Sequence, residues 1–246
     1  MKVVSCLSNE LTLGIYVPSY KRSDSILTYH LFEYCKYMVR ESEKAAYLAA
    51  GIKPEDLWAV PDHLIDGGDK AYFYIIDNAP EDIIVIADDD ILDFRYMLDN
   101  VVEVGKDPEV ITSEIERIGQ ILYDLRIGHA FIGPNAIPYM YDREFAFKGI
   151  PGAVKWYNKA VFKGKLDDKV AENFDMDIIL QELLVNRICL MPKYLYDKGY
   201  MDVNAGGNSS RKRKDQLDSI TNMKAKWGKY FEYNLEKNKP KINVDR

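Results

Sequence analysis

The chain has 246 residues, a formal net charge of −6, 47% hydrophobic residues and 29% charged residues. This composition excludes a disordered or fibrous chain, and the length provides enough apolar side chains for a full hydrophobic core. No apolar run approaches the roughly 20 residues of a membrane span, and the N-terminus lacks the apolar stretch of a secretion signal. The three cysteines lie far apart, without zinc-ligand spacing. We therefore expect a soluble protein of the reducing cytoplasm.

Short apolar runs alternate with helical segments in the N-terminal part of the chain. The pattern predicts strands at 13–17, 35–39, 57–60 and 83–87, and helices at 24–32, 43–50 and 70–78. Ser23 or Asp24 is a suitable cap for the first helix, and Gly51 is a suitable stop for the second. This alternation predicts an α/β, Rossmann-like domain whose central sheet is mostly parallel and flanked by helices.

The second half of the chain begins with the helix-start signal Asp107-Pro108-Glu109. An apolar stripe at helical spacing follows, formed by Ile111, Ile115, Ile118, Leu122 and Leu125. Further strands are predicted at 128–133, at 147–157 and at 187–191, with a helix at 173–185 between the last two. From Asp197 onward the composition predicts a loop, a basic cluster and a tail.

An acidic cluster, Asp88 to Asp90, directly follows the apolar run Ile83–Ala87. A strand that ends in carboxylates places them at the carboxyl edge of the sheet, where open α/β sheets bind ligands. Alternation along an extended backbone predicts that Asp88 and Asp90 point to one side and Asp89 to the other. Two carboxylates on one side are suitable ligands for Mg²⁺ or Mn²⁺. By itself, such a cluster is more typical of an acidic surface turn than of a binding site.

Three segments occur in an informative order: VPSYKR after the first strand, ADDD after the fourth, and DMDIILQELL at a late helix. In this order they resemble an inverting, family-2-type glycosyltransferase of the GT-A fold, over residues 13–192. The resemblance implies a catalytic domain at 1–196, with a nucleotide-sugar half (1–100) and an acceptor half (101–196). It implies Mn²⁺ or Mg²⁺ as cofactor and a nucleoside-diphosphate sugar, most simply a UDP-sugar, as donor. Residues 197–246 would then be a loop and a basic, aromatic tail that closes over the site.

The first matching segment implies a nucleotide-binding loop made of Pro18, Ser19, Tyr20 and Arg22. Tyr20 would stack on the base, and Arg22 would pair with a phosphate, because a guanidinium fork matches phosphate oxygens. A structural turn after the strand is the alternative for this loop.

The middle of the chain adds further residues that the resemblance places near the donor. Asp66 and Lys70, on either side of a Gly-Gly loop, would lie close to the nucleotide, unless the loop is merely flexible. Asp88 and Asp90 match the metal-binding DxD motif, with Asp90 as the more direct ligand, and Asp89 is expected to contact the nucleotide sugar.

The late segment Asp175-Met176-Asp177 matches the position of the catalytic base, with Asp175 as the base itself. The family has a Glu before this Asp, whereas this chain has Phe174, and its nearest acid is Glu172. Asp175 and Glu172 therefore both remain candidates. A carboxylate at a helix N-terminus is kept ionised by the helix dipole, which a base requires, but the same position also suits a purely structural Asp.

Many GT-A enzymes take a third metal ligand from a late histidine, but the histidines here are His30, His63 and His129. Asn208, in a Gly-rich loop, is the substitute candidate. Arg211 and Arg213 would close over the diphosphate, or would simply form a solvated basic face.

The tail alternates Lys with Trp227, Tyr230, Phe231 and Tyr233. It resembles phage-type glycosyltransferases that modify hydroxymethylated pyrimidines in DNA, which implies a DNA acceptor and an infected host cell as location. Aromatic and basic residues would suit an unstacked base and its phosphates. The alternatives are a tail helix packed on the core, a saccharide, lipid or protein acceptor, and a non-catalytic module that binds sugar nucleotides.

Overall fold

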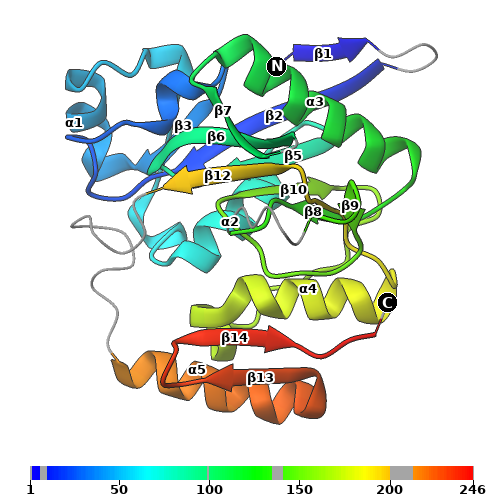
Figure 1. The fold of residues 1–246 in the computed structure, drawn as a ribbon. Helices are drawn as coiled ribbons and strands as arrows, with labels where there is room; N and C mark the ends of the chain where they lie inside the picture. The colour runs from blue at the N-terminus through cyan, green and yellow to red at the C-terminus, as the bar shows by residue number, and fades with distance from the viewer. Residues whose placement is uncertain (1, 6–9, 99, 135–140, 200–212, 246) are drawn as a thin grey trace.

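The structure is a computed structural model that describes residues 2–5, 10–98, 100–134, 141–199 and 213–245. Its main sheet has the strand order β4-β3-β2-β5-β10-β8, and β1 pairs with β2 as a seventh strand (Figure 1). The strands are β1 (Lys2–Ser5), β2 (Glu10–Pro18), β3 (Lys36–Arg40), β4 (Leu57–Val60), β5 (Ile83–Ala87), β8 (His129–Phe131) and β10 (Val154–Asn158). Strands β2 to β5 are parallel to one another, and β10 is antiparallel to both β5 and β8.

Helices cover both faces of this sheet and bury the central strand β5 completely. Ile83, Val85 and Ala87 point into the same core cluster as the stripe of α3 (Pro108–Asp124), whereas Ile84 and Ile86 pack with α2 (Gly68–Asn78). A strand with two buried faces has to be apolar at every position, which explains its uninterrupted apolar sequence. The fold predicted from the sequence, an α/β domain with a mostly parallel sheet, is therefore confirmed.

Several predicted elements occur at or close to their predicted bounds. They include β4 and β5, α1 (Lys44–Ala49) before Gly51, α2, α3 and α4 (Phe174–Val185). Asp107 caps α3 because its side chain accepts hydrogen bonds from the amides of Glu109 and Val110. Cys35 and Cys189 are buried free thiols, whereas Cys6 lies outside the described residues.

The helix predicted at 24–32 is wrong, because only the 3₁₀ turn Thr28–Leu31 forms there. The Thr28 hydroxyl donates to the carbonyl of Asp88 (2.8 Å) and accepts from the amide of Ile91 (3.0 Å). These tertiary hydrogen bonds fix the segment against the acidic turn, and they outweigh the local capping signal that predicted a helix.

A second, three-stranded sheet was not predicted. It has the order β12-β6-β7, with β6 (Ile91–Leu98), β7 (Asn100–Gly105) and β12 (Leu195–Gly199). The predicted strand 187–191 is reduced to β11 (Met191–Pro192), which pairs with β9 (Phe145–Ala146). The loop expected from Asp197 onward is wrong for its first residues, since β12 runs to Gly199 and pairs with β6.

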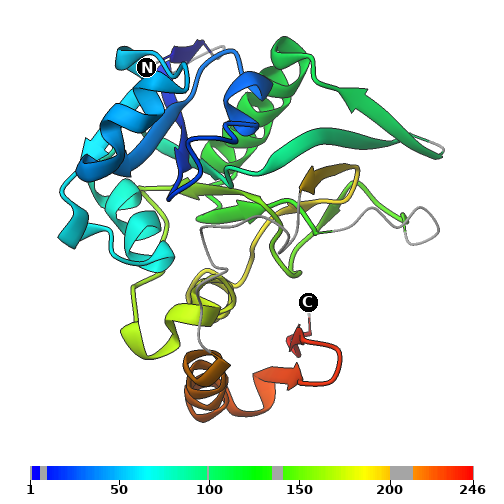
Figure 2. The same cartoon turned by 90° about the vertical axis from the view of Figure 1, so that its left-hand side faces the viewer.

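The C-terminal residues form a layer outside α4, on the side away from the main sheet (Figures 1 and 2). This layer contains α5 (Arg213–Trp227) and the hairpin of β13 (Phe231–Asn234) and β14 (Lys239–Ile242). Phe231 is only 1% exposed and belongs to a core cluster that joins this layer to α4. None of the helices that the structure describes is long and apolar enough to cross a membrane.

The apolar stripe of α3 is buried as expected except at its last position. Ile118 is 0% exposed, whereas Leu125, at the C-terminal end of the helix, is 64% exposed. We expect Ile118→Ala to lower the free energy of unfolding by about 2–5 kcal/mol, through lost burial and the cavity left behind. Leu125→Ala should change it by no more than about 0.5 kcal/mol. Urea unfolding of both variants checks this, and equal losses would contradict the assignment of Leu125 to the surface.

Candidate active site

A cleft of about 840 Å³ opens at the carboxyl edge of the parallel strands. It is lined by the loop after β2, the start of α2, the acidic turn after β5, the start of α4 and the end of β12. Most of the predicted site residues line this cleft: Pro18, Ser19, Tyr20, Arg22, Asp66, Asp88, Asp89, Asp90, Glu172 and Asp175. The fold therefore brings together three segments that are far apart in the sequence.

Two of the described predicted residues do not line the cleft. Lys70 is not among the lining residues, and neither is Arg213, an exposed residue at the start of α5. Asn208 and Arg211 lie outside the described residues, so their predicted roles stay predictions.

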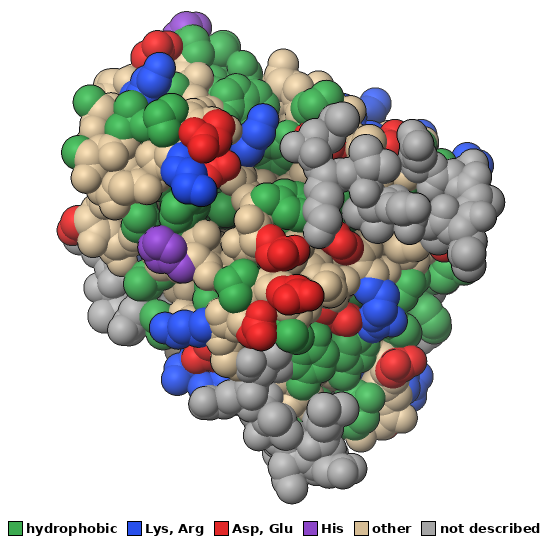
Figure 3. Space-filling model, turned by 90° about the horizontal axis from the view of Figure 1, so that it is seen from above, with side chains coloured by type: hydrophobic (Ala, Val, Ile, Leu, Met, Phe, Trp, Pro, Cys, Tyr) green, Lys and Arg blue, Asp and Glu red, His purple; other side chains and the backbone are tan. Residues whose placement is uncertain are grey.

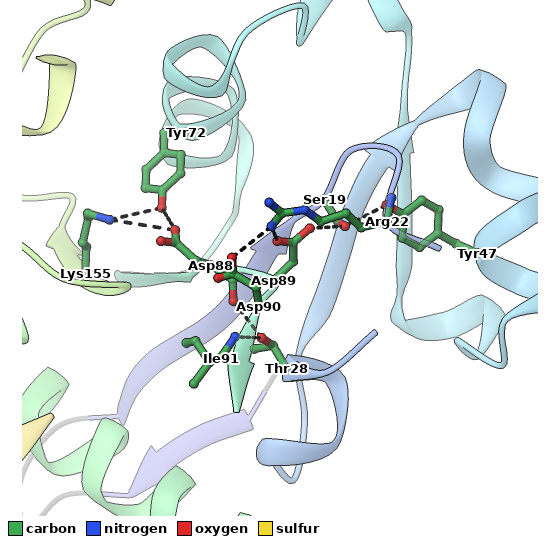
Figure 4. Close-up of polar contacts among 10 residues, drawn as sticks. All are labelled: Ser19, Arg22, Thr28, Tyr47, Tyr72, Asp88, Asp89, Asp90, Ile91 and Lys155. Carbon is green, nitrogen blue, oxygen red and sulfur yellow. Dashed lines mark hydrogen bonds and ion pairs between the residues drawn. The ribbon is translucent and has the colours of Figure 1, made fainter. Parts of the chain in front are cut away.

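In the acidic turn, the carboxylates of Asp89 and Asp90 both reach Arg22, whereas that of Asp88 is directed toward Tyr72 (Figure 4). The backbone turns at Asp89 and Asp90 before β6 begins at Ile91, so the simple alternation of an extended strand does not apply. The side chains of Asp88 and Asp90 are 43% and 21% exposed, whereas that of Asp89 is 7% exposed. The predicted grouping of Asp88 and Asp90 on one side is therefore wrong, although these two carboxylates are the more exposed ones.

Arg22 holds this turn together. One guanidinium nitrogen pairs with Asp89 and lies 3.2 Å from Oδ2 of Asp90. Its side chain is only 14% exposed, and although burial lowers the pKa of the guanidinium, the charge of Asp89 raises it above its ordinary value. In this structure Arg22 therefore neutralises protein carboxylates, whereas the sequence pattern predicted a phosphate as its partner.

Asp89 is bound on its other side by the loop after β2. The Ser19 hydroxyl donates to Oδ2 of Asp89, and the hydroxyl groups of Ser19 and Tyr47 lie 2.7 Å apart. Tyr47 also accepts a hydrogen bond from the backbone amide of Arg22. Asp89 thus fixes the loop after β2 to the acidic turn.

Asp88 is oriented by two residues that sequence reasoning missed. The Tyr72 hydroxyl, from α2, donates to Oδ1 of Asp88 at 2.6 Å. The ammonium of Lys155, from β10, lies 4.0 Å from the same oxygen and 3.3 Å from the Tyr72 hydroxyl (Figure 4). Lys155 is only 5% exposed, and its position in the otherwise apolar run AVKWY is the one sequence signal that marks it.

The site concentrates negative charge. Burial, together with the charges of Asp88 and Asp89, raises the pKa of Asp90 to about 6 against the opposing effect of Arg22. Burial also raises the pKa of Asp89. Acidic side chains likewise gather near the middle of the face shown in Figure 3, with basic side chains around them. Carboxylates brought this close together favour a bound cation.

At the other end of the cleft, Tyr20 lies under the guanidinium of Arg40, which is 4.0 Å from the ring centroid. The residue pair is a flat, cationic surface beside Pro18 and Met38. Asp66 and Lys70 form an exposed ion pair of 2.6 Å across the first turn of α2. Of these two, only Asp66 borders the cleft.

The two candidate bases lie at the start of α4, on the opposite side of the cleft from β3, which ends at Arg40. Asp175 is in the first turn of this helix, and its Oδ1 accepts from the amide of Met176 at 2.8 Å. Glu172 precedes it in a 3₁₀ turn, Asp168–Asn173. The ring of Phe174 packs against Tyr72 at 5.1 Å between centroids, so one residue, Tyr72, contacts both Asp88 and the start of α4.

Asp197 is a further carboxyl group in the cleft that sequence reasoning did not find. It lies on β12, and its Oδ1 accepts from the amide of Ala153 at 3.2 Å. Burial raises the pKa of Asp197 to about 7, and the charge of Asp88 contributes in the same direction. No motif marks it, because only the pairing of β12 with β6 brings it here.

The donor atoms at the turn suit a divalent cation that also binds a diphosphate. Among the described residues, no group of three carboxylate, His or Cys side chains is arranged to hold a metal. Mg²⁺ is commonly held by one or two carboxylates together with phosphate oxygens and water. Asp88 and Asp90 fit that arrangement, since both line the cleft and both are more exposed than Asp89.

No protein-family model matches the chain, and no curated protein does. Solved structures do match it. A glucosyl-3-phosphoglycerate synthase from Mycobacterium tuberculosis, in complex with Mn²⁺, UDP and phosphoglyceric acid, has a TM-score of 0.52 at 9% identity. The match covers 94% of this chain and 86% of that one. A complex of the same enzyme with Mg²⁺ and UDP gives a TM-score of 0.50 at 9% identity, over 94% and 87% of the two chains.

Another match, described only as a mycobacterial protein, has a TM-score of 0.52 at 9% identity and covers 95% of this chain and 83% of that one. The chain has a GT-A-like fold. Similarity at this level of identity establishes the fold alone and carries no residue roles with it.

The raised pKa of Asp197 predicts how the stability of the protein depends on pH. The fold favours the protonated carboxyl, so between the ordinary pKa of 3.8 and about 7 the native state binds more protons than the unfolded state. The contribution of Asp197 to stability therefore falls as the pH rises through this window. Asp197→Asn keeps an acceptor for the Ala153 amide and removes the titration.

We expect the variant to gain stability relative to the wild type, by more than about 1 kcal/mol, between pH 4 and pH 8. Urea unfolding at several pH values measures this difference. A difference that is constant with pH would show that Asp197 ionises in the folded protein as it does in the unfolded chain.

Proposed function

We propose that this protein is a metal-dependent glycosyltransferase that moves a sugar from a nucleoside-diphosphate sugar to a hydroxyl group. One observation carries the proposal: the nucleotide-loop residues, the acidic turn and the start of α4 all line a single cleft at the carboxyl edge of a GT-A-like sheet. The complexes of the matching synthase with UDP and Mn²⁺ or Mg²⁺ favour a UDP-sugar as donor and either cation as cofactor.

Asp88 and Asp90 are the residues that would hold the cation. A divalent ion bound there supplies positive charge to the diphosphate as it leaves. Tyr72 and Lys155 keep the Asp88 carboxylate in place, and Arg22 and Ser19 keep the turn in place. These contacts fit a site whose carboxylates must be held in place before the donor binds.

Asp175 is the proposed general base. It takes the proton from the acceptor hydroxyl, whose oxygen then attacks the anomeric carbon as the bond to the diphosphate breaks. Its place in the first turn of α4 stabilises the carboxylate form through the helix dipole. A single displacement of this kind inverts the configuration at the anomeric carbon. Glu172, which also lines the cleft, is the alternative base.

We propose that the acceptor is a molecule with a free hydroxyl group, which need not be DNA. Two of the tail's aromatic residues assigned to DNA bases contact the protein itself: Phe231 is 1% exposed, and the Trp227 indole donates to Asp177 at 2.6 Å. The proposal of a hydroxymethylated pyrimidine in DNA as acceptor is therefore supported by the sequence resemblance alone. Saccharide, lipid and protein acceptors are the alternatives.

The test uses UDP-glucose, Mn²⁺ and glycerol as a surrogate acceptor. We expect UDP release that requires Mn²⁺, and a glycoside product whose anomeric configuration, read by proton NMR, is inverted relative to the donor. Removing a general base typically costs a factor of about 10²–10⁴ in rate, so Asp175→Asn should fall in that range while Glu172→Gln stays within a few fold of wild type.

The other results are equally informative. UDP binding without turnover of any UDP-sugar would point to the non-catalytic binding module. Retained configuration would contradict the single displacement. Loss of activity in Glu172→Gln with Asp175→Asn still active would move the base to Glu172.

A further inference from the structure

We infer that α5 is a positioning element for the catalytic carboxylate: its hydrogen bonds to the residues on both sides of Asp175 hold the start of α4, so that Asp175 faces the cleft in one fixed place. This inference rests on the proposed function, because it concerns the residue assigned as the base. It gives the C-terminal layer a role different from the acceptor binding predicted from the tail sequence.

The main contact is a buried carboxylate, Asp177. Its side chain is 2% exposed, yet it accepts three hydrogen bonds, two of them from α5. The Trp227 indole donates at 2.6 Å, the Lys226 ammonium at 2.9 Å and the Gln181 amide, from α4 itself, at 2.6 Å. A buried charge is costly unless it is paired and hydrogen-bonded, so Asp177 ties α4 to α5.

A second polar contact lies on the other side of Asp175. Asn173, 6% exposed, donates from its side-chain amide to the hydroxyl of Ser219 on α5 at 2.9 Å, and Ser219 is 3% exposed. The α5 side chain of Asn222 also bonds the carbonyl of Lys169, in the 3₁₀ turn that carries Glu172. The residues before and after Asp175 are therefore both fixed to α5.

Helix geometry explains why this arrangement would orient Asp175. Within α4, residues 175 and 177 are two apart and therefore point to roughly opposite sides of the helix, while Asn173, just before the helix, is also bonded to α5. Met176 and Leu180 share the side that faces α5 and pack against Ile220, Met223 and Phe231. With Asn173 and Asp177 directed toward α5, the side chain of Asp175 is directed into the cleft that it lines.

Position matters for a base more than for most residues. A general base must lie within hydrogen-bond reach of the proton it removes, and a displacement of about 1 Å can cost roughly 10² in rate. The contacts from α5 touch neither the acidic turn nor the nucleotide loop. Their loss should therefore affect transfer and leave donor binding unchanged.

The experiment uses Trp227→Phe, which removes the indole donor and keeps an aromatic ring in place, and Lys226→Met. For each variant the rate of UDP-glucose turnover with glycerol is measured together with the affinity for UDP and Mn²⁺. We expect kcat to fall at least tenfold, with KM for UDP-glucose and the UDP affinity within twofold of wild type. Lys226→Arg, which keeps the positive charge, should retain most of the activity.

Asp167→Asn is the matched control. Asp167 is the other partner of Lys226, at 2.8 Å on the surface, and Asn keeps its bond to the Lys169 amide. This variant should match wild type in kcat. Thermal unfolding of every variant, with assays run well below the transition, separates a misplaced base from a partly unfolded enzyme.

Two outcomes distinguish this inference from the proposed function. If Asp175→Asn abolishes transfer while Trp227→Phe and Lys226→Met both keep wild-type kcat, α5 does not position the base and the inference is wrong. If Asp175→Asn has full activity, the base assignment fails instead, and the inference fails with it. A matched fall in kcat and UDP affinity would also overturn the inference, since it would indicate a general disturbance of the fold.

Discussion

The ion pairs of Arg22 with Asp89 and Asp90 are the interaction on which the site depends. Three consecutive carboxylates at the end of a buried strand repel one another, and burial makes this repulsion stronger. Arg22 removes part of that cost, and the hydroxyl of Ser19 on the same loop bonds Asp89 as well. The loop after β2 and the turn after β5 are therefore held as one unit, with Asp88 and Asp90 still open toward the cleft.

The rest of the fold supports this unit from different directions. Strand β5 brings the carboxylates to the sheet edge and is buried on both faces, so it has little freedom to move. From α2, Tyr72 bonds Asp88 and packs against Phe174 at the start of α4. On the far side of α4, α5 bonds Asn173 and Asp177. A continuous set of contacts thus runs from the acidic turn to the C-terminal layer.

Local patterns in the sequence predicted the parts of the fold that local physics determines. Strand β5 and helices α2, α3 and α4 have apolar periodicity, caps or turn residues that identify them without knowledge of the partner. In the second sheet, the pairing of β12 with β6 joins residues about a hundred positions apart, so no local pattern identifies it. Strands β6 and β7 pair as a local hairpin, which the sequence analysis missed. The helix predicted at 24–32 does not form because the hydrogen bonds of Thr28 to the acidic turn outweigh the local capping signal at Ser23 or Asp24.

The site shows the same division. Ser19 and Asp88 follow parallel strands, which end at one edge of the sheet, so their shared cleft could be predicted from the strand pattern, whereas only the family resemblance placed Asp175 there. The partner of Arg22, the buried Lys155 and the carboxyl of Asp197 depend on where side chains from distant strands meet, so no motif identified them. The sequence shows that the tail is basic and aromatic, but whether Trp227 turns toward solvent or toward Asp177 is decided by packing alone.

The central claim is that Asp88 and Asp90 hold a cation that joins the protein to a diphosphate. A crystal structure of the protein with UDP and Mg²⁺ tests it most directly. The account predicts one Mg²⁺ about 2.1 Å from a carboxylate oxygen of Asp88 or Asp90 and from oxygens of the diphosphate, with the Arg22 ion pairs intact. UDP bound in the cleft with no cation at this turn, or with the cation held by other residues, would contradict it.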